Sequence, residues 1–271
     1  TGDKAVNCSN RFLLKTMDNQ DPQELTFNIA NSIWHREGLR MQGDFLSTAR
    51  DCYHAKIAPL NFGAPDAADK INNWVTEKTN GKIDRMVDAL APDDVMFLLN
   101  AVYFKGKWKY TFDKDMTRDE DFFPAAGEAV EVPMMYRTGE QFLYQENDLF
   151  QAVKLPYTDQ HWGMYIFLPR QESSLEALED NLIYDNWDNW MDGFRSREGS
   201  VGLPRFTIRY EKKLNEVLKS MGMEIAFDEG DADFGNMVEK GSIRGNIYID
   251  EVKHKSFLEV NEEGTEAAAV T

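Results

Sequence analysis

Hydrophobic and polar residues alternate over several segments of the chain, with the period of two that is typical of β-strands. Alternation of this kind predicts strands at residues 25–34, 53–59, 201–210 and 246–260. Residues 95–106 are almost uninterruptedly apolar, which predicts a strand covered on both of its faces. Between residues 130 and 169 the pattern predicts a strand-rich meander, and turn residues such as Gly139 separate its strands.

Helices are predicted between these strands. The four segments are residues 43–49, 66–81, 173–190 and 211–222. The second is the clearest, because Ile71, Trp74 and Val75 fall on one face at helical spacing and Asn80-Gly81 supplies a left-handed stop. The sum is an α+β fold in which long strands form more than one sheet.

The organisation is that of a single domain. A chain of 271 residues is long enough to bury a substantial core. No linker rich in proline or serine divides it, and no internal repeat is visible. We therefore expect residues 1–271 to belong to one domain.

One polar residue interrupts the apolar run at 95–106. Asn100 stands in its middle, and a buried amide without hydrogen-bond partners costs about 1–3 kcal/mol. Its position predicts that polar partners lie beside it in the fold.

Composition narrows the classes of partner. Hydrophobic residues make up 42% of the chain and aromatic residues 12%, as expected for a folded protein. The formal net charge of −17 disfavours nucleic acid and anionic membranes as partners, and basic proteins or peptide segments are easier ones. No stretch is long enough for a transmembrane helix, and the N-terminal residues show no signal-peptide pattern.

The two cysteines, Cys8 and Cys52, are too few for a disulfide scaffold and have no metal-site spacing. They are interpreted as two free thiols or one optional bridge. Asn7-Cys8-Ser9 fits a glycosylation sequon, although such matches are frequent by chance.

No catalytic site is visible in the sequence. The nucleophile elbow, the phosphate-binding loop, the dinucleotide-binding fingerprint and the zinc-binding helix motif are all missing. The four histidines are scattered and show no metal-ligand spacing. We therefore predict no enzyme activity, no cofactor and no metal.

The C-terminal residues are the remaining lead. If they form a strand, Thr265, Ala267, Ala269 and Thr271 face one way, and all four side chains are small. Glu266, Ala268 and Val270 then face the other way. A strand that enters between two existing strands needs small inward side chains, and Gly264 would give it the free dihedral angles of a hinge. Composition alone favours a loose tail or a frayed helix instead.

A set of motifs closely resembles the signature of the serpin family. The motifs occur in the family's order over nearly the whole chain: IANSIW (29–34), NNWVTEKTNGKI (72–83), NAVYFKGKW (100–108) with Phe112 and Asp113, YIFLP (165–169), LPRFTI (203–208) and HKSFLEVNEEGTEAAA (254–269). The resemblance implies a large central mixed β-sheet with two smaller sheets and surrounding helices.

The resemblance also assigns positions. It places the 66–81 helix across the front of the large sheet, and it places Asn100 and His254 as a polar pair beneath the sheet's centre. Trp108 corresponds to the aromatic residue at the top of the sheet, where insertion of the loop begins. Arg205 and Glu262 correspond to a basic–acidic pair at the base of the hinge.

By the same resemblance, the C-terminal residues are the proximal hinge of a reactive-centre loop. The hinge residues are Glu262, Glu263, Gly264, Thr265, Glu266, Ala267, Ala268, Ala269, Val270 and Thr271. Only Val270 adds bulk, and we expect it on the outward-facing side. Small residues here are typical of inhibitory members, which trap a protease as a covalent acyl-enzyme by inserting the loop into the sheet.

The implied partners are a target protease and the rest of the serpin polypeptide. A serine protease is the default target, a papain-like cysteine protease is possible, and neither nucleic acid nor a membrane is expected. A whole serpin has further segments before and after this region, so we expect the domain to be completed by other residues. A non-inhibitory carrier or chaperone is the alternative function. The family habit suggests secretion.

Overall fold

The computed structural model describes residues 2–17 and 24–271. Six strands form a large mixed sheet in the order β2-β1-β3-β11-β10-β9, in which only β1 and β2 are parallel. Their bounds are Leu25–Arg36 for β1, Lys56–Leu60 for β2, Met96–Lys107 for β3, Phe206–Lys213 for β9, Lys253–Val260 for β10 and Gly264–Val270 for β11.

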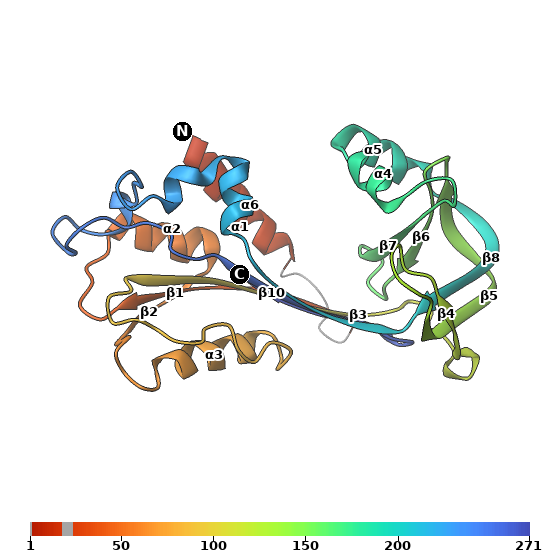
Figure 1. Ribbon diagram of the computed structural model, residues 1–271, viewed down its shortest axis with the longest axis horizontal. Helices are drawn as coiled ribbons and strands as arrows, with labels where there is room; N and C mark the ends of the chain where they lie inside the picture. The colour runs from red at the N-terminus through yellow and green to blue at the C-terminus, as the bar shows by residue number, and fades with distance from the viewer. Residues whose placement is uncertain (1, 18–23) are drawn as a thin grey trace.

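A second, five-stranded sheet lies beyond one end of the large sheet (Figure 1). Its strands are β4 (Arg118–Phe122), β5 (Val130–Glu146), β6 (Phe150–Pro156), β7 (Gly163–Pro169) and β8 (Arg195–Pro204). The order is β4-β5-β6-β7, and β8 also pairs with β5. Strand β5 pairs with β4 at its start, with β8 from Met134 to Tyr144 and with β6 from Leu143 to its end, so it joins the regions expected as two smaller sheets.

The helices lie on the faces and ends of the two sheets. They are α1 (Gly2–Met17), α2 (Gly43–Tyr53), α3 (Ala67–Lys78), α4 (Leu175–Asp180), α5 (Tyr184–Gly193) and α6 (Asn215–Leu218). Figure 1 shows α3 below the large sheet, α1, α2 and α6 above it, and α4 and α5 beside the second sheet. The α+β prediction and the helix at 66–81 are confirmed.

The apolar stripe of α3 forms one core with the large sheet. Ile71 and Val75 are fully buried against Leu99, Ala101 and Tyr103 of β3. The helix ends as predicted, because Asn80 and Gly81 adopt φ values of 50° and 78°. This packing places α3 directly over the strands in the middle of the large sheet.

The opposite face of the large sheet is incompletely covered. Leu98 of β3 is 55% exposed, and Ile208 and Tyr210 of β9 are 50% and 47% exposed. The prediction that residues 95–106 are covered on both faces is therefore wrong for the described residues. An apolar run predicts burial, but it does not say which other residues supply the cover.

Two predicted elements are split. Residues 173–190 form α4 and α5, because the side chain of Asn181 donates to the carbonyl of Ala177 and Ile183 is extended. Residues 201–210 belong to β8 and β9, which pair with different sheets. The alternating pattern continues across the break, so it does not reveal the change of partner.

Other boundaries shift. Strand β9 runs to Lys213, so the helix predicted at 211–222 begins only at Asn215. After α6 it continues as a π-helical turn at Lys219–Met223, in which Gly222 has a φ of 99°. The strand predicted at 246–260 begins only at Lys253, because Asn215 bonds to the backbone of Asp250 and Val252. Gly139, with φ of 70°, marks a bulge within β5 and not a turn between strands.

Near the N-terminus, α2 extends to Tyr53 and β2 begins three residues later than expected. Helix α1 was not predicted. It places Asn7 in mid-helix, where its side-chain oxygen accepts a hydrogen bond from the Tyr53 hydroxyl at 2.9 Å. This engagement favours the chance-match interpretation of the sequon. Cys8 and Cys52 are free.

Candidate functional site: a hinge strand in the middle of the large sheet

Strand β11 lies between β3 and β10 and runs antiparallel to both. Thr265 pairs with Gly106 on one side and with Val260 on the other, and the register continues to Val270. The residues after Gly264 therefore form a central strand of the sheet. The interpretation as a loose tail or a frayed helix is wrong for this structure.

A tight turn connects β10 to β11. The side-chain oxygen of Asn261 accepts hydrogen bonds from the amides of Glu263 and Gly264 at 3.0 and 3.2 Å. Trp108 fixes the turn from the side: its amide donates to the carbonyl of Glu263, and its indole nitrogen donates to the carbonyl of Asn261, both at 2.9 Å. The indole also stacks on Tyr157, with ring centroids 4.8 Å apart. Trp108 thus lies beside the turn from which β11 begins.

Gly264 is the position of β11 at which a side chain has no room. Its φ is not among the positive values, so the strand conformation itself does not need a glycine. A Cβ atom here would collide with the carbonyl oxygen of Gly106 and would lie 3.0 Å from the Cα of Lys107. Both obstacles belong to the backbone of β3, so only glycine fits at this point of the sheet.

Small side chains occupy one face of β11. Thr265 is 4% exposed, and its hydroxyl accepts a hydrogen bond from Tyr157 at 3.0 Å. Burial raises the pKa of Tyr157 to about 12, so the phenol stays a donor over the whole ordinary pH range. Ala267 and Ala269 on the same face are half-buried.

The other face of β11 lies beneath α3. Ala268 is 2% exposed and Val270 is fully buried in the core that α3 forms with the sheet. The alternation of β11 side chains is as predicted, but the expected outward position of Val270 is wrong. The residue points away from the small-residue face and is nevertheless covered, because α3 lies on that side.

A row of polar residues crosses the large sheet at the end of β11. The side chain of Asn100 donates to that of Asn31 at 2.8 Å, and Asn31 donates to the carbonyl of Tyr53 at 2.7 Å. Thr271 exchanges backbone hydrogen bonds with Asn100, and its hydroxyl lies 2.5 Å from Nδ1 of His254. The structure thus brings Asn100 and His254 to one level of the sheet, with Thr271 between them. The interrupting amide has the polar partners that its position predicted.

Glu262 anchors the base of the hinge. Its carboxylate is 5% exposed, lies 3.3 Å from the guanidinium of Arg205 and accepts a hydrogen bond from the Thr117 hydroxyl at 2.9 Å. The neighbouring Glu263 is exposed and pairs with Lys114 at 2.6 Å. The pair is therefore half-buried, because the Glu262 side chain is enclosed while that of Arg205 is 51% exposed.

Sequence reasoning missed Tyr157, Asn31 and Thr117 as members of this site. Asn31 carried only a weak signal, since it is one of several polar residues in its strand-like segment, whereas Asn100 interrupts an apolar run. Tyr157 and Thr117 carried none, because only the fold brings them near the hinge.

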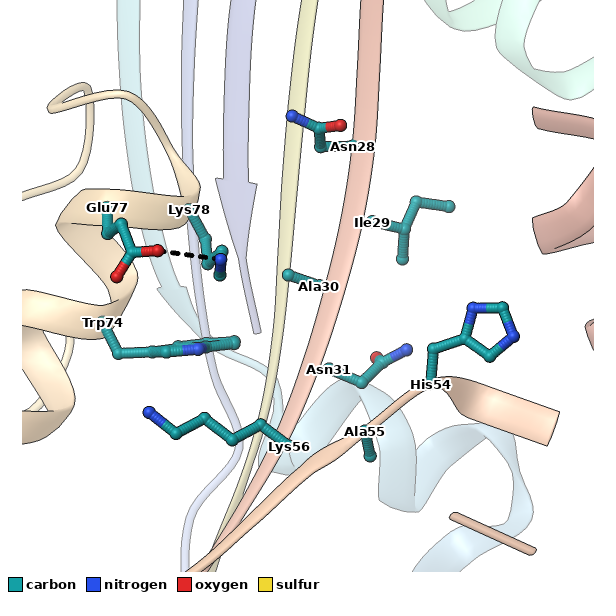
Figure 2. Close-up of a pocket in the computed structure, with 10 residues that line it drawn as sticks. All are labelled: Asn28, Ile29, Ala30, Asn31, His54, Ala55, Lys56, Trp74, Glu77 and Lys78. Atoms are coloured by element: carbon teal, nitrogen blue, oxygen red, sulfur yellow. Dashed lines mark hydrogen bonds and ion pairs between the residues drawn. The ribbon is translucent and has the colours of Figure 1, made fainter. Parts of the chain in front are cut away.

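A pocket of about 610 Å³ lies beside β1, on the side away from β11. Figure 2 shows Trp74 and Lys78 of α3 on one side of the strand and His54 on the other. Strand β3 separates this pocket from the hinge strand, so it is a separate feature. Among residues 2–17 and 24–271, no group of three or more potential ligands could hold a metal ion. No helix in the same part of the chain is long and apolar enough to cross a membrane.

The geometry described above is that of an α+β protein. A strand of small residues, one arm of a tight hairpin, lies in the middle of its large sheet. The family model described as Serpin (serine protease inhibitor) matches residues 1–271. The chain belongs to the serpin family.

Individual serpins are similar in sequence to this chain over nearly its whole length. A serpin-like protein of Thermococcus kodakarensis is 38% identical over 96% of this chain and 60% of its own length. Leukocyte elastase inhibitor of Xenopus tropicalis is 34% identical over 99% of this chain and 72% of its own. The chain thus spans about 60–72% of the length of these two relatives.

Solved structures show the same fold. The thermophilic serpin tengpin in the latent state has a TM-score of 0.88 and 31% identity, over 98% of this chain and 71% of tengpin. The cleaved serpin 42Da has a TM-score of 0.89 and 31% identity over the same shares. The serpin fold predicted from the sequence is confirmed.

Proposed function

We propose that this chain is the larger part of a protease inhibitor that acts as a suicide substrate and traps its target by inserting β11 into the large sheet. One observation carries the proposal. Strand β11 has neighbours on both edges, and Gly264 lies against the backbone of β3 with no room for a side chain. A segment with this composition is suited to enter a sheet, and serpin reactive loops are a known case of an extended segment adding to a sheet.

The chemistry belongs to the protease. Its nucleophile attacks the carbonyl carbon of a loop peptide bond on the C-terminal side of Thr271, and an acyl-enzyme forms. The peptide C–N bond breaks, and the amine leaves with the proton that the nucleophile gave up. Insertion of β11 before water attacks the acyl bond carries the attached protease along the sheet and distorts its catalytic site. The inhibitor contributes no catalytic residue to these steps.

Insertion is driven by contacts that β11 makes only inside the sheet. Burying a valine side chain such as Val270 contributes about 1.5–3 kcal/mol. Each backbone hydrogen bond contributes about 0.5–1.5 kcal/mol net. These gains accumulate along the strand from Gly264 to Val270 and favour the inserted state once the loop is cut.

The proposed partners are a target protease and the remaining serpin residues. A serine protease is the default target and a cysteine protease the alternative, because both form acyl-enzymes. The exposed Leu98, Ile208 and Tyr210 support a further segment of the same polypeptide that covers this face and completes the domain. The net charge of −17 supports neither nucleic acid nor an anionic membrane as a partner.

The fold alone does not decide between inhibition and a carrier role. Thyroxine-binding globulin and emu ovalbumin have TM-scores of 0.87 at 24% and 23% identity, which shows the fold alone. The small residues and the glycine of the hinge favour inhibition. Secretion stays a prediction.

A mixing experiment on the full-length protein tests the proposal. The protein is incubated with a panel of serine and cysteine proteases and separated on denaturing gels. A band at the summed mass that survives boiling supports the covalent trap, and sequencing the released C-terminal peptide locates the cleaved bond. Cleavage by every protease of the panel without any such band would contradict inhibition and favour the carrier or chaperone role.

A further inference from the structure

The turn that follows α3 has a fixed shape. The hydroxyl of Thr79, which is fully buried, donates to the carbonyl of Val75 at 2.8 Å and accepts from the amide of Ile83 at 3.2 Å. Asn80 and Gly81 both adopt left-handed conformations. The turn therefore has a well-defined backbone conformation, and the side chains of Asn80 and Lys82 extend from it over the large sheet.

From this turn, two side chains reach three consecutive strands. The amide of Asn80 donates to the hydroxyl of Tyr103 on β3 at 3.2 Å. The ammonium of Lys82 lies 3.0 Å from the carboxylate of Glu266 on β11 and 3.4 Å from that of Glu259 on β10. Tyr103 donates a further hydrogen bond to Glu266 at 2.6 Å. The turn thus bridges the inserted strand and both of its neighbours.

The charges at this level of the sheet explain why a lysine lies here. Glu259 and Glu266 are direct cross-strand partners, and like charges in that position destabilise a sheet. On its other side Glu266 pairs in register with Lys105, whose side chain is exposed. Only Lys82 contacts both carboxylates among the described residues.

The contacts of Lys82 are partly shielded from water. The side chains of Lys82 and Glu266 are 23% and 15% exposed, so salt screens their attraction less than that of a surface pair. The ammonium also lies 5.0 Å from the ring centroid of Phe257, beneath it on β10. Burial acts to raise the pKa of Glu266, but hydrogen bonds from Tyr103 and Lys82 outweigh it and lower that pKa.

We infer that Lys82 is a positioning residue for strand insertion, because its ammonium neutralises the two carboxylates that insertion of β11 brings face to face. The inference rests on the proposed function, since the opposed pair exists only when β11 lies beside β10. Before insertion, Glu266 belongs to the loop and Lys82 has no second carboxylate to neutralise on β11. Lys82 thereby stabilises the inserted state selectively.

The test compares the melting temperature of the full-length protein before and after its loop is cut by a protease. The wild type is expected to melt at a higher temperature after cleavage. In Lys82→Met, which keeps an apolar stem over Phe257, we expect that gain to shrink by about 3 °C or more. Lys82→Arg should restore the gain. Lys114→Met, which breaks only the exposed pair with Glu263, should leave it unchanged.

A second variant separates the inference from a general loss of stability. In a Glu266→Gln background the carboxylate pair is absent, so Lys82→Met should reduce the gain less than it does alone. Glu266→Gln alone also provides the test if Lys82→Met does not fold: neutralising Glu266 should weaken the dependence of the gain on salt.

The outcomes are distinguishable. If the wild type shows no gain on cleavage, the proposed function fails and the inference fails with it. If the wild type shows the gain and Lys82→Met shows the same gain, the inference alone is wrong. Equal losses in the cut and uncut forms would make Lys82 a merely structural residue and would also overturn the inference.

Discussion

Replacing Gly264 with alanine is expected to convert this protein from an inhibitor into a substrate. The added methyl group would collide with the carbonyl oxygen of Gly106, and it would lie 3.0 Å from the Cα of Lys107 and 3.1 Å from the carbonyl carbon of Gly106. All three atoms belong to the backbone of β3, so no side chain can rotate away. The strand itself must shift or lose its register.

The magnitude follows from the packing. Overfilling a close-packed site costs about 1–3 kcal/mol, and more where the backbone must move. The cost falls on the inserted state alone, because Gly264 in an uninserted loop has no backbone against it. A rise of about 1.4 kcal/mol in the insertion barrier slows insertion tenfold, while hydrolysis of the acyl-enzyme continues at its own rate. More molecules are then cleaved for each protease that is trapped.

The assay is the stoichiometry of inhibition, the number of inhibitor molecules consumed per protease inactivated, measured on the full-length protein. Gly264→Ala should raise it severalfold and reduce the covalent band on denaturing gels. Gly43→Ala is the matched control, since a methyl group at Gly43 meets nothing within 4 Å. An unchanged stoichiometry for Gly264→Ala would refute the reasoning, because the methyl group could not then be meeting β3.

Three further predictions concern the same strand. Thr265→Arg should leave protease binding intact and abolish trapping, because a charged side chain would replace one that is 4% exposed. A stable covalent complex of this variant with a protease would contradict the prediction. His254→Ala should lower the melting temperature of the loop-cut protein by about 2–4 °C, because it removes the partner of the Thr271 hydroxyl. An unchanged melting temperature would show that this contact does not stabilise the loop-cut form. Burial and the Glu266 carboxylate raise the pKa of Tyr103 from 10.0 to about 12, so its stabilising contribution is complete below pH 10 and is lost as the pH rises towards 12. Tyr103→Phe should therefore flatten the alkaline decline in the denaturant midpoint, and an identical decline in both proteins would count against the raised pKa.

The sequence predicted those parts of the fold that depend on local patterns. The stripe of Ile71, Trp74 and Val75 and the stop at Asn80-Gly81 define α3, because both depend only on neighbours within one or two turns. Parity along β11 was also correct, since alternation is a property of any strand.

Features that depend on distant residues could not be predicted. Nothing in the local pattern shows that Val270 lies under α3, because this requires knowing which helix covers which face. Gly264 suggested a hinge with free dihedral angles, but no local pattern shows that the backbone of β3, over 150 positions away in the chain, leaves no room there for a side chain. The alternating run at 201–210 likewise hid the change of sheet at Pro204, since both halves have the same period.

The site residues also fall into two groups: those that the local sequence pattern marked, and those that only the fold brings to the site. Asn100 stood out as an amide in an apolar strand, and its partners confirm the physical reason for noticing it. Tyr157 had no distinguishing context in the sequence, and Lys82 lay within the motif at 72–83 without any pattern that revealed its partners. Their contacts with Thr265 and Glu266 arise only once β11 lies in the sheet.

Backbone amide hydrogen exchange over residues 264–271 tests the central claim most directly. The full-length protein is measured before and after its loop is cut, with β10 as an internal reference that is paired in both states. The account predicts rapid exchange before cleavage and protection comparable with that of β10 afterwards, because the amides then bond to β3 and β10. Rapid exchange that persists after cleavage would contradict insertion as the basis of function.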